Sequence, residues 1–332
     1  MKTRTVAGRT WHFTLAIGRV VGPEGFYHPT PIAGGLAGDV YVANMGGGDP
    51  RQRAHKIDHL TTDGEYIRAI GQGDFTWPEG LAVDQDGTLY CSDAYSHNVL
   101  AYDSEGTRVA SWGEFGSAEG QLQKPAGLAV DAEGRLLVVD GDNHRVQTFT
   151  PDGEFISAWG TAGSDDGQLN LPCGITIDPA GDVYVADWGN DRVQKFAPDG
   201  TFLRRFGSTF DDGGQLRRPT DVAVDSDGDV YVVDWGNNRV QIYDSEGDII
   251  TGLYGDARVL SETAQEQMDA NPDYVRALDR VSDEDMLELG RFERPRGIAI
   301  DQEDRVVVTD CTRCRLQIYA KDKDFADPQF NL

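Results

Sequence analysis

The sequence predicts an all-β protein, and more specifically a six-bladed β-propeller whose blades are four-stranded antiparallel sheets. The first observation is repetition: Asp187–Phe196 returns as Asp234–Tyr243 and Asp140–Phe149, with looser copies that begin at Asp93 and Asp310. The second is the spacing of the prolines that open each copy. They are separated by 49, 47, 47, 47 and 76 residues, at Pro29, Pro78, Pro125, Pro172, Pro219 and Pro295. Six units therefore follow one another, with an insertion of about 29 residues before the last.

Each unit contains four short runs that are typical of β-strands. In the fourth unit they are Gly174–Asp178, Asp182–Asp187, Arg192–Phe196 and Phe202–Gly207. The runs are rich in β-branched and aromatic residues, and Gly, Pro, Asp or Asn separates them. A single sheet of this size cannot bury both faces, so the units are expected to stack around an axis as propeller blades.

The two ends of the chain predict how the ring closes. The sixth unit has no fourth strand, whereas Phe13–Gly18 has no unit of its own and reads like Phe155–Gly160. We therefore expect Phe13–Ile17 to pair with Leu316–Tyr319 as the outer strand of blade 6, which leaves no open sheet edge between the ends. Residues 1–12 are interpreted as a polar tail, and residues 1–332 as one domain.

Two segments depart from the repeat. The insertion, at about residues 256–291, contains good helix formers, and Ser282 followed by three acidic residues resembles a helix N-cap. We expect two or three short helices there, which form either a lid over the axial mouth or a decoration on the rim. The Gly-rich segment Met45–Arg53 replaces the motif loop in blade 1, either for a function or through drift in a terminal repeat.

Composition limits the classes of partner and compartment. Asp and Glu number 56 against 30 Lys and Arg, a formal charge of −26, and such a surface repels phosphate backbones. Nucleic acid is therefore an unlikely partner. No apolar run has the length of a signal peptide or a membrane span, and the four cysteines do not suggest a disulfide framework. The default expectation is a cytoplasmic protein with no membrane association.

The repeat resembles the NHL family over about residues 13–319. The shared features are a Pro-x-Gly opening, an Asp-x-x-Asn-x-Arg-Val-Gln motif, and a Gly-Gln-Leu link between units. The link occurs at Gly120–Leu122, Gly167–Leu169 and Gly214–Leu216. The resemblance implies a six-bladed propeller but no single function, because NHL rings include protein-binding modules, RNA-binding modules and lyases. The chain is also distantly similar to amidating lyases and to propellers of the virginiamycin B lyase type.

The residue after each anchor proline is expected to lie at the mouth of the axial channel, the usual site of a propeller. These residues are Thr30, Glu79, Ala126, Cys173, Thr220 and Arg296. The amidating lyases carry zinc-binding histidines at this position in alternate blades, and none of the six residues is histidine. Glu79 and Cys173 alone are too few ligands for zinc. No cofactor is predicted, and a divalent metal at the axial mouth has no support from the residues.

A second ring precedes the motif arginine and contains three histidines. Its members are His55, His97, His144, Asp191, Asn238 and Cys314. Neighbouring blades separate equivalent positions by about 10 Å or more, too far for three histidines to share one ion. We interpret them as polar loop residues at the surface. The Asp–Arg pair of each motif is interpreted as structural, and the solitary pair Cys311 and Cys314 predicts neither a zinc nor a redox site.

Aromatic and basic residues gather on the face that carries the motif loops. Trp188, Trp235 and Tyr95 are placed to stack on a ligand or to pack at the pore rim. Basic residues beside the anchor prolines form a collar that would attract an anion: Lys124, Arg217, Arg218, Arg294 and Arg296. The candidate ligand-binding residues are therefore His28, Thr30, Glu79, Tyr95, Trp188, Thr220, Trp235, Arg218 and Arg296.

Two functions fit these residues. The leading hypothesis is a module that binds a protein or an anionic small molecule through its loop face and axial mouth. The alternative is a small-molecule lyase or hydrolase at the channel mouth, with Glu79 as general base, Arg296 as anion clamp, and Cys173 or His28 nearby. RNA binding ranks third, because only the basic collar supports it.

Overall fold

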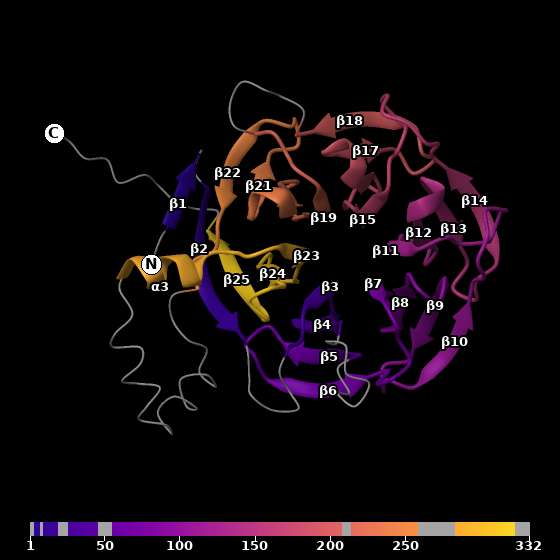
Figure 1. Cartoon of the computed structure of the whole chain (residues 1–332), viewed down its shortest axis with the longest axis horizontal. Coiled ribbons are helices and arrows are strands. Elements are labelled where there is room, and N and C mark those ends of the chain that lie inside the picture. The colour runs from indigo at the N-terminus through magenta and orange to yellow at the C-terminus, as the bar shows by residue number, and fades with distance from the viewer. Residues whose placement is uncertain are drawn as a thin grey trace.

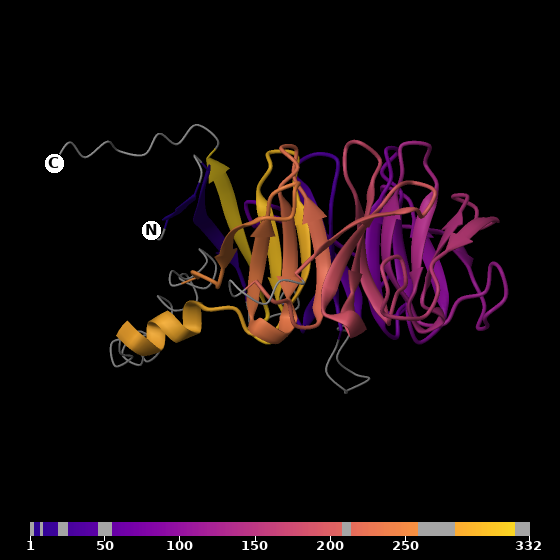
Figure 2. The ribbon, with the colours of Figure 1, turned by 90° about the horizontal axis from the view of Figure 1, so that it is seen from above.

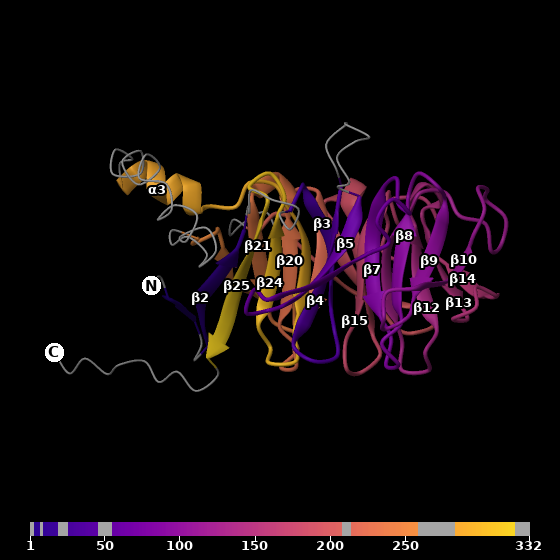
Figure 3. The same ribbon diagram turned by 90° about the horizontal axis from the view of Figure 1, so that it is seen from below.

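Six antiparallel sheets surround a central axis in the computed structural model, which describes residues 3–6, 9–18, 26–45, 55–207, 214–257 and 283–322. One strand of each sheet lies at the axis and the other strands lie progressively farther out (Figure 1). Figures 2 and 3 show the ring from its edge, with the strands of all blades running between two loop-bearing faces. The all-β, six-bladed prediction is confirmed.

Blades 1 to 5 each contain four strands that follow one another from the axis outward. Blade 1 has β3 (Pro29–Gly34), β4 (Asp39–Asn44), β5 (Lys56–Thr61) and β6 (Tyr66–Ile70); blade 2 has β7 (Pro78–Val83), β8 (Leu89–Asp93), β9 (Asn98–Tyr102) and β10 (Arg108–Trp112). Blade 3 has β11 (Pro125–Val130), β12 (Leu136–Asp140), β13 (Arg145–Phe149) and β14 (Phe155–Trp159); blade 4 has β15 (Pro172–Ile177), β16 (Val183–Asp187), β17 (Arg192–Phe196) and β18 (Phe202–Phe206). Blade 5 has β19 (Pro219–Val224), β20 (Val230–Asp234), β21 (Arg239–Tyr243) and β22 (Ile249–Leu253). Single 3-10 turns follow the second strand in three blades: η1 (Gly141–Asn143), η2 (Trp188–Asn190) and η3 (Trp235–Asn237).

Blade 6 joins the two ends of the chain. Its strands, from the axis outward, are β23 (Pro295–Ile300), β24 (Val306–Asp310), β25 (Arg315–Asp322), β2 (Arg9–Ile17) and β1 (Thr3–Val6). In the pairing of β2 with β25, Phe13 lies opposite Tyr319 and Ile17 lies opposite Leu316. The predicted closing strand is therefore confirmed.

The interpretation of residues 1–12 as a polar tail is wrong. Residues 9–12 lengthen β2, and β1 adds a fifth strand to the blade. The physical reason is Trp11, which is fully buried between blades 5 and 6 and donates a 3.0 Å hydrogen bond from Nε1 to the Tyr231 hydroxyl. Lys321 is also buried there, within ion-pair distance of Asp225 and Asp229.

Hydrophobic clusters between neighbouring blades form the core. In the described residues, each of the six junctions has its own cluster, made of side chains from the facing surfaces of two sheets. Gly181 and Gly200 close turns within blade 4 at φ values of +91° and +85°, as the sequence predicts for tight turns. The blades thus stack as sheets, and the turns confine the chain to the two faces.

The insertion contains α3 (Asp283–Gly290), which lies outside the ring beside blade 6 in all three views (Figures 1, 2 and 3). α3 therefore lies at the rim and does not cover the axis. The other predicted helices and the proposed N-cap Ser282 fall within residues 258–282, outside the described residues. Most of the Gly-rich segment of blade 1, residues 46–53, also lies outside them.

Replacing Trp11 with alanine tests the closure between blades 5 and 6. The change empties a buried site and removes the bond to Tyr231, so the free energy of unfolding in urea should fall by about 3–5 kcal/mol. Val109, an exposed residue on β10, provides the control, and Val109→Ala should change the value by less than about 0.5 kcal/mol. Equal effects of the two changes would contradict the closure.

Candidate functional site

A buried aspartate at the end of the second strand fixes the loop face in blades 2 to 6, and in blades 3 to 6 it pairs with the motif arginine. In blade 4 this residue is Asp187, and its Oδ1 accepts the backbone N–H of Asn170 at 2.6 Å. Its Oδ2 accepts three side-chain donors: Arg192 Nε at 2.8 Å, Asn190 Nδ2 at 2.9 Å and Gln194 Nε2 at 3.2 Å. We call this arrangement the aspartate clamp. Its Asp–Arg pair recurs at Asp140 with Arg145, Asp234 with Arg239 and Asp310 with Arg315. The structural interpretation of these pairs is confirmed.

The clamp also holds the link that arrives from the preceding blade. Arg192 Nη2 donates to the carbonyl oxygens of Asp165 and Gln168, each at 2.8 Å. Gln194 donates to the Gln168 carbonyl at 2.7 Å and accepts the N–H of Gly167 at 3.0 Å. The Gly-Gln-Leu link of the sequence is therefore the partner of the motif's Arg and Gln.

Four residues of the second ring, in blades 2 to 5, join neighbouring blades at the same face. Each of the four adopts a left-handed conformation, with φ near +55°, and offers a side-chain acceptor to the N–H before the next anchor proline. The four bonds are Lys124 N–His97 Nδ1 at 3.1 Å, Leu171 N–His144 Nδ1 at 3.1 Å, Arg218 N–Asp191 Oδ1 at 2.7 Å and Arg294 N–Asn238 Oδ1 at 2.9 Å. We call them junction bonds. His97 and His144 therefore accept backbone hydrogen bonds that fix the junctions, which the interpretation as surface loop residues missed.

The six residues that follow the anchor prolines all line the axial channel, and His55, His97 and His144 do not. The channel has a volume of about 340 Å³. An ion pair crosses it between blades 2 and 6, with Arg296 Nη2 at 2.9 Å from Glu79 Oε2. Trp77 Nε1 donates to the other carboxylate oxygen of Glu79 at 2.5 Å. Burial lowers the pKa of Arg296, but the carboxylate of Glu79 raises it, and the net result is an Arg296 pKa above the ordinary value.

Asp221 is a channel residue that the sequence analysis did not include among the candidates. It occupies the Gly position of the Pro-x-Gly opening in blade 5. Elsewhere this glycine permits close approach of the inner strands: a Cβ on Gly127 would lie 2.6 Å from the carbonyl oxygen of Cys173. The replacement of glycine by aspartate in this Pro-x-Gly opening was the sequence signal that could have identified Asp221.

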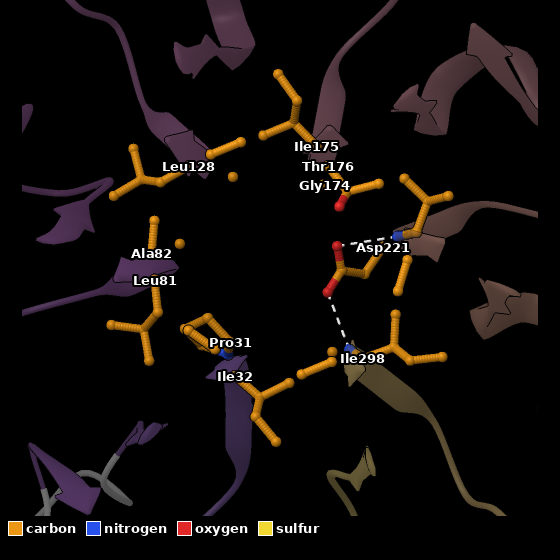
Figure 4. Close-up of a pocket in the computed structure, with 18 of the residues that line it drawn as sticks. Pro31, Ile32, Leu81, Ala82, Leu128, Gly174, Ile175, Thr176, Asp221 and Ile298 are labelled. Carbon is orange, nitrogen blue, oxygen red and sulfur yellow. Dashed lines mark hydrogen bonds between the residues drawn. The ribbon is translucent and has the colours of Figure 1, made fainter. Parts of the chain in front are cut away.

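The Asp221 carboxylate reaches into a channel lined mainly by apolar side chains (Figure 4). It accepts the N–H groups of Val222 and Ile298, each at 3.0 Å, and so bridges blades 5 and 6. Channel solvent touches part of the side chain, yet the surrounding protein desolvates it. This desolvation raises the pKa of Asp221 to about 7, although the two N–H groups and Arg296 oppose the rise. Asp221 can therefore exchange a proton near neutral pH.

The remaining candidates differ in exposure and partners. Thr30 is buried, and Thr220 donates a 2.9 Å bond to the Arg296 carbonyl. Burial raises the pKa of the Cys173 thiol to about 12, and Glu79 adds to the rise. His28 Nδ1 lies 3.9 Å from Cys311 Sγ, where burial raises the thiol pKa to about 11. Cys311 and Cys314 are free thiols.

A pocket of about 770 Å³ lies at the channel mouth on the loop face. Its aromatic lining comes from four residues: Trp77, Tyr95, Trp188 and Trp235. Glu79, Cys173, Thr220 and Arg296 belong to both this pocket and the channel. The structure therefore joins the aromatic and the axial candidates in one concave site. The described residues contain no group of three His, Cys, Asp or Glu able to hold a metal ion.

The basic collar divides into paired and unpaired members. Arg296 pairs with Glu79, and Lys124 pairs with Asp142 at 2.9 Å. The Arg218 guanidinium lies 4.8 Å from the centre of the Trp188 ring, and Arg294 lies 5.5 Å from that of Trp235. Within the described part of the chain, no acidic side chain forms an ion pair with Arg217, Arg218 or Arg294.

Replacing Asp221 with asparagine tests its raised pKa. Because the folded-state pKa lies above the ordinary 3.8, the carboxyl contributes its stability below about pH 4 and loses it as pH rises through about 7. Relative to Asp221→Asn, the wild type should lose about 1–3 kcal/mol of unfolding free energy between pH 4 and pH 8. Chemical denaturation across that range provides the measurement. Parallel pH profiles would show that Asp221 has an ordinary pKa.

Two family models match different parts of the chain. The NHL repeat model matches residues 169–196, 216–243 and 292–319, and the SMP-30/Gluconolactonase/LRE-like region model matches residues 35–166. Each NHL match begins in the link before an anchor proline and ends in the third strand of the blade. The chain therefore contains NHL repeats. No curated protein is significantly similar to its sequence.

Solved propellers resemble the whole ring at low sequence identity. A protein of unknown function from Bacteroides thetaiotaomicron has a TM-score of 0.66 and 18% identity, over 95% of this chain and 76% of the other. A gluconolactonase from Xanthomonas campestris has 0.61 and 15%, over 96% and 91%. Virginiamycin B lyase from Staphylococcus aureus has 0.58 and 12%, over 93% and 99%. These likenesses establish the fold alone. In the described residues, no helix is long and apolar enough to cross a membrane.

Proposed function

We propose that this propeller, built of NHL repeats, is a binding module that holds its ligand at the axial mouth of the loop face. The observation that supports the proposal is the pocket at the channel mouth, which we call the mouth pocket. Its volume of about 770 Å³ falls within the range of about 300–1,000 Å³ that is typical of ligand sites. An aromatic wall over a floor with a few convergent polar groups is also typical of such sites.

The pocket favours a ligand, or a side chain of a partner protein, with an apolar or aromatic part and a polar end. Trp77 and Tyr95 are exposed, and an apolar group that covered them would remove their surfaces from water. Below them, the Glu79–Arg296 pair supplies acceptors and donors in a fixed orientation. Because the clamps and junction bonds fix the loops, the pocket is largely formed before the ligand arrives.

The alternative function is a small-molecule lyase or hydrolase at the same mouth, and the Glu79–Arg296 pair favours it. Glu79 would act as general base and Arg296 would bind an anionic oxygen of the substrate. Cys173 is a poor nucleophile at neutral pH, because its raised pKa keeps the thiol protonated. Turnover of a lactone panel that Glu79→Gln abolishes would establish the enzyme, whereas ligand binding without turnover would favour the module.

Binding of 1-anilinonaphthalene-8-sulfonate tests the mouth pocket, because its fluorescence rises in an apolar environment. The native protein should bind this probe, and the double change Trp77→Ala with Tyr95→Ala should weaken the binding at least about tenfold, equal to 1.4 kcal/mol. Leu203→Ala removes an exposed apolar side chain from the outer strand β18 and serves as the control. If the probe does not bind, or binds the double variant equally, the mouth is not the ligand site.

A further inference from the structure

Two neighbouring junctions on the loop face carry the same pair of side chains. At the junction of blades 4 and 5, Arg218 stacks on Trp188, and at the junction of blades 5 and 6, Arg294 stacks on Trp235. In both pairs the tryptophan follows the clamp aspartate and the arginine precedes the next anchor proline. Both indoles line the mouth pocket, so the two guanidinium groups stand at its edge.

The backbone frame does not require these arginines. At the junction of blades 3 and 4 the same two positions hold Gly141 and Leu171. Leu171 nevertheless has φ of +49°, close to the +52° of Arg218, and makes the same junction bond. The frame therefore accepts a side chain without charge, and the two Trp–Arg pairs are additions to it.

The guanidinium groups are available for a ligand. Arg218 and Arg294 are exposed, and no described carboxylate forms an ion pair with either of them. This is notable in a chain with 56 acidic residues, several of which pair with arginines elsewhere on the ring. A guanidinium carries five N–H donors, so one that contacts an indole ring can also donate to a carboxylate.

We propose that Arg218 and Arg294 bind two carboxylates of an extended acidic segment of a partner protein. An apolar side chain between the two acids would enter the mouth pocket, so the proposal rests on the proposed function and names its partner. Equivalent loop positions on neighbouring blades lie about 10 Å or more apart. In an extended chain, acids four residues apart lie about 13 Å apart and point to the same side as the side chain midway between them. The net charge of −26 repels RNA, which carries a negative charge at every phosphate, more strongly than a peptide segment with two acids.

An array of fluorescein-labelled octapeptide pools tests the proposal. Each pool has two glutamates that are one to five residues apart, with the other positions randomised among Gly, Ser, Leu and Phe. Matched pools carry glutamines. The native protein should retain the pools with acids four residues apart, and their affinity should exceed that of the glutamine pools at least tenfold.

The double variant Arg218→Gln with Arg294→Gln should lose this preference while it keeps the native circular dichroism spectrum. The control variant Arg205→Gln changes an exposed arginine on the outer strand β18, away from the two junctions, and should retain the preference for acidic pools. Equal retention of glutamine pools, retention by the double variant, or retention of no pool would overturn the inference. Binding of a single-stranded RNA oligomer that depends on the two arginines, without peptide binding, would overturn it too. Binding of the naphthalene sulfonate probe by the double variant would leave the proposed function intact.

Discussion

The loop face of the ring depends on a carboxylate that is buried without access to water. Burying a charge is costly unless hydrogen bonds and an opposite charge compensate it. In blade 4, Asp187 obtains four donors, one of them charged. Burial raises the pKa of Asp234 and Asp310 in the equivalent clamps, and the surrounding donors oppose the rise. Loss of any donor would leave part of the desolvation cost uncompensated, so the loops are held together as a unit.

Blade 1 meets the same constraint with different residues. Asn44 replaces the clamp aspartate, Lys56 replaces the arginine, and Asp58 stands on the third strand at the position of the glutamine. Lys56 and Asp58 form a buried ion pair at 2.6 Å, and Asn44 Nδ2 donates to Asp58 at 2.7 Å. The carboxylate has moved by one strand, but the site still contains one buried pair of opposite charges. Divergence at this blade therefore preserved the electrostatic balance.

A rigid frame leaves the side chains beside it free to differ. Four junction bonds hold residues as different as Lys124 and Leu171 in one backbone conformation. The same face therefore presents an aromatic pocket above a Glu–Arg pair and, at two junctions, exposed arginines stacked on tryptophans. The repeated residues fix the backbone of the scaffold, and the residues that differ between blades determine which ligands the face can bind.

The sequence predicted what repeats and missed what depends on single side chains. The blades, the closing strand and the Asp–Arg pairs could be predicted, because each follows from the repeat period of the sequence or from an interruption of that period. Trp11 was missed because a lone aromatic residue among polar neighbours does not reveal a pocket on another blade. His97, His144, Asp191 and Asn238 look unrelated as residue types. Their common property is a side-chain acceptor combined with a left-handed backbone, which becomes evident only when the neighbouring N–H is seen.

Amide hydrogen exchange of an Asp187→Ala variant tests most directly whether the buried carboxylate holds the loop face. The account predicts faster exchange in peptides that cover residues 163–171 and 188–194, because the link and the loop both lose their common acceptor, while the strands of blades 1 and 2 keep native protection. Asp152→Ala makes the same chemical change at an exposed turn and should leave the exchange unaltered. Native protection of both segments in Asp187→Ala would contradict the account.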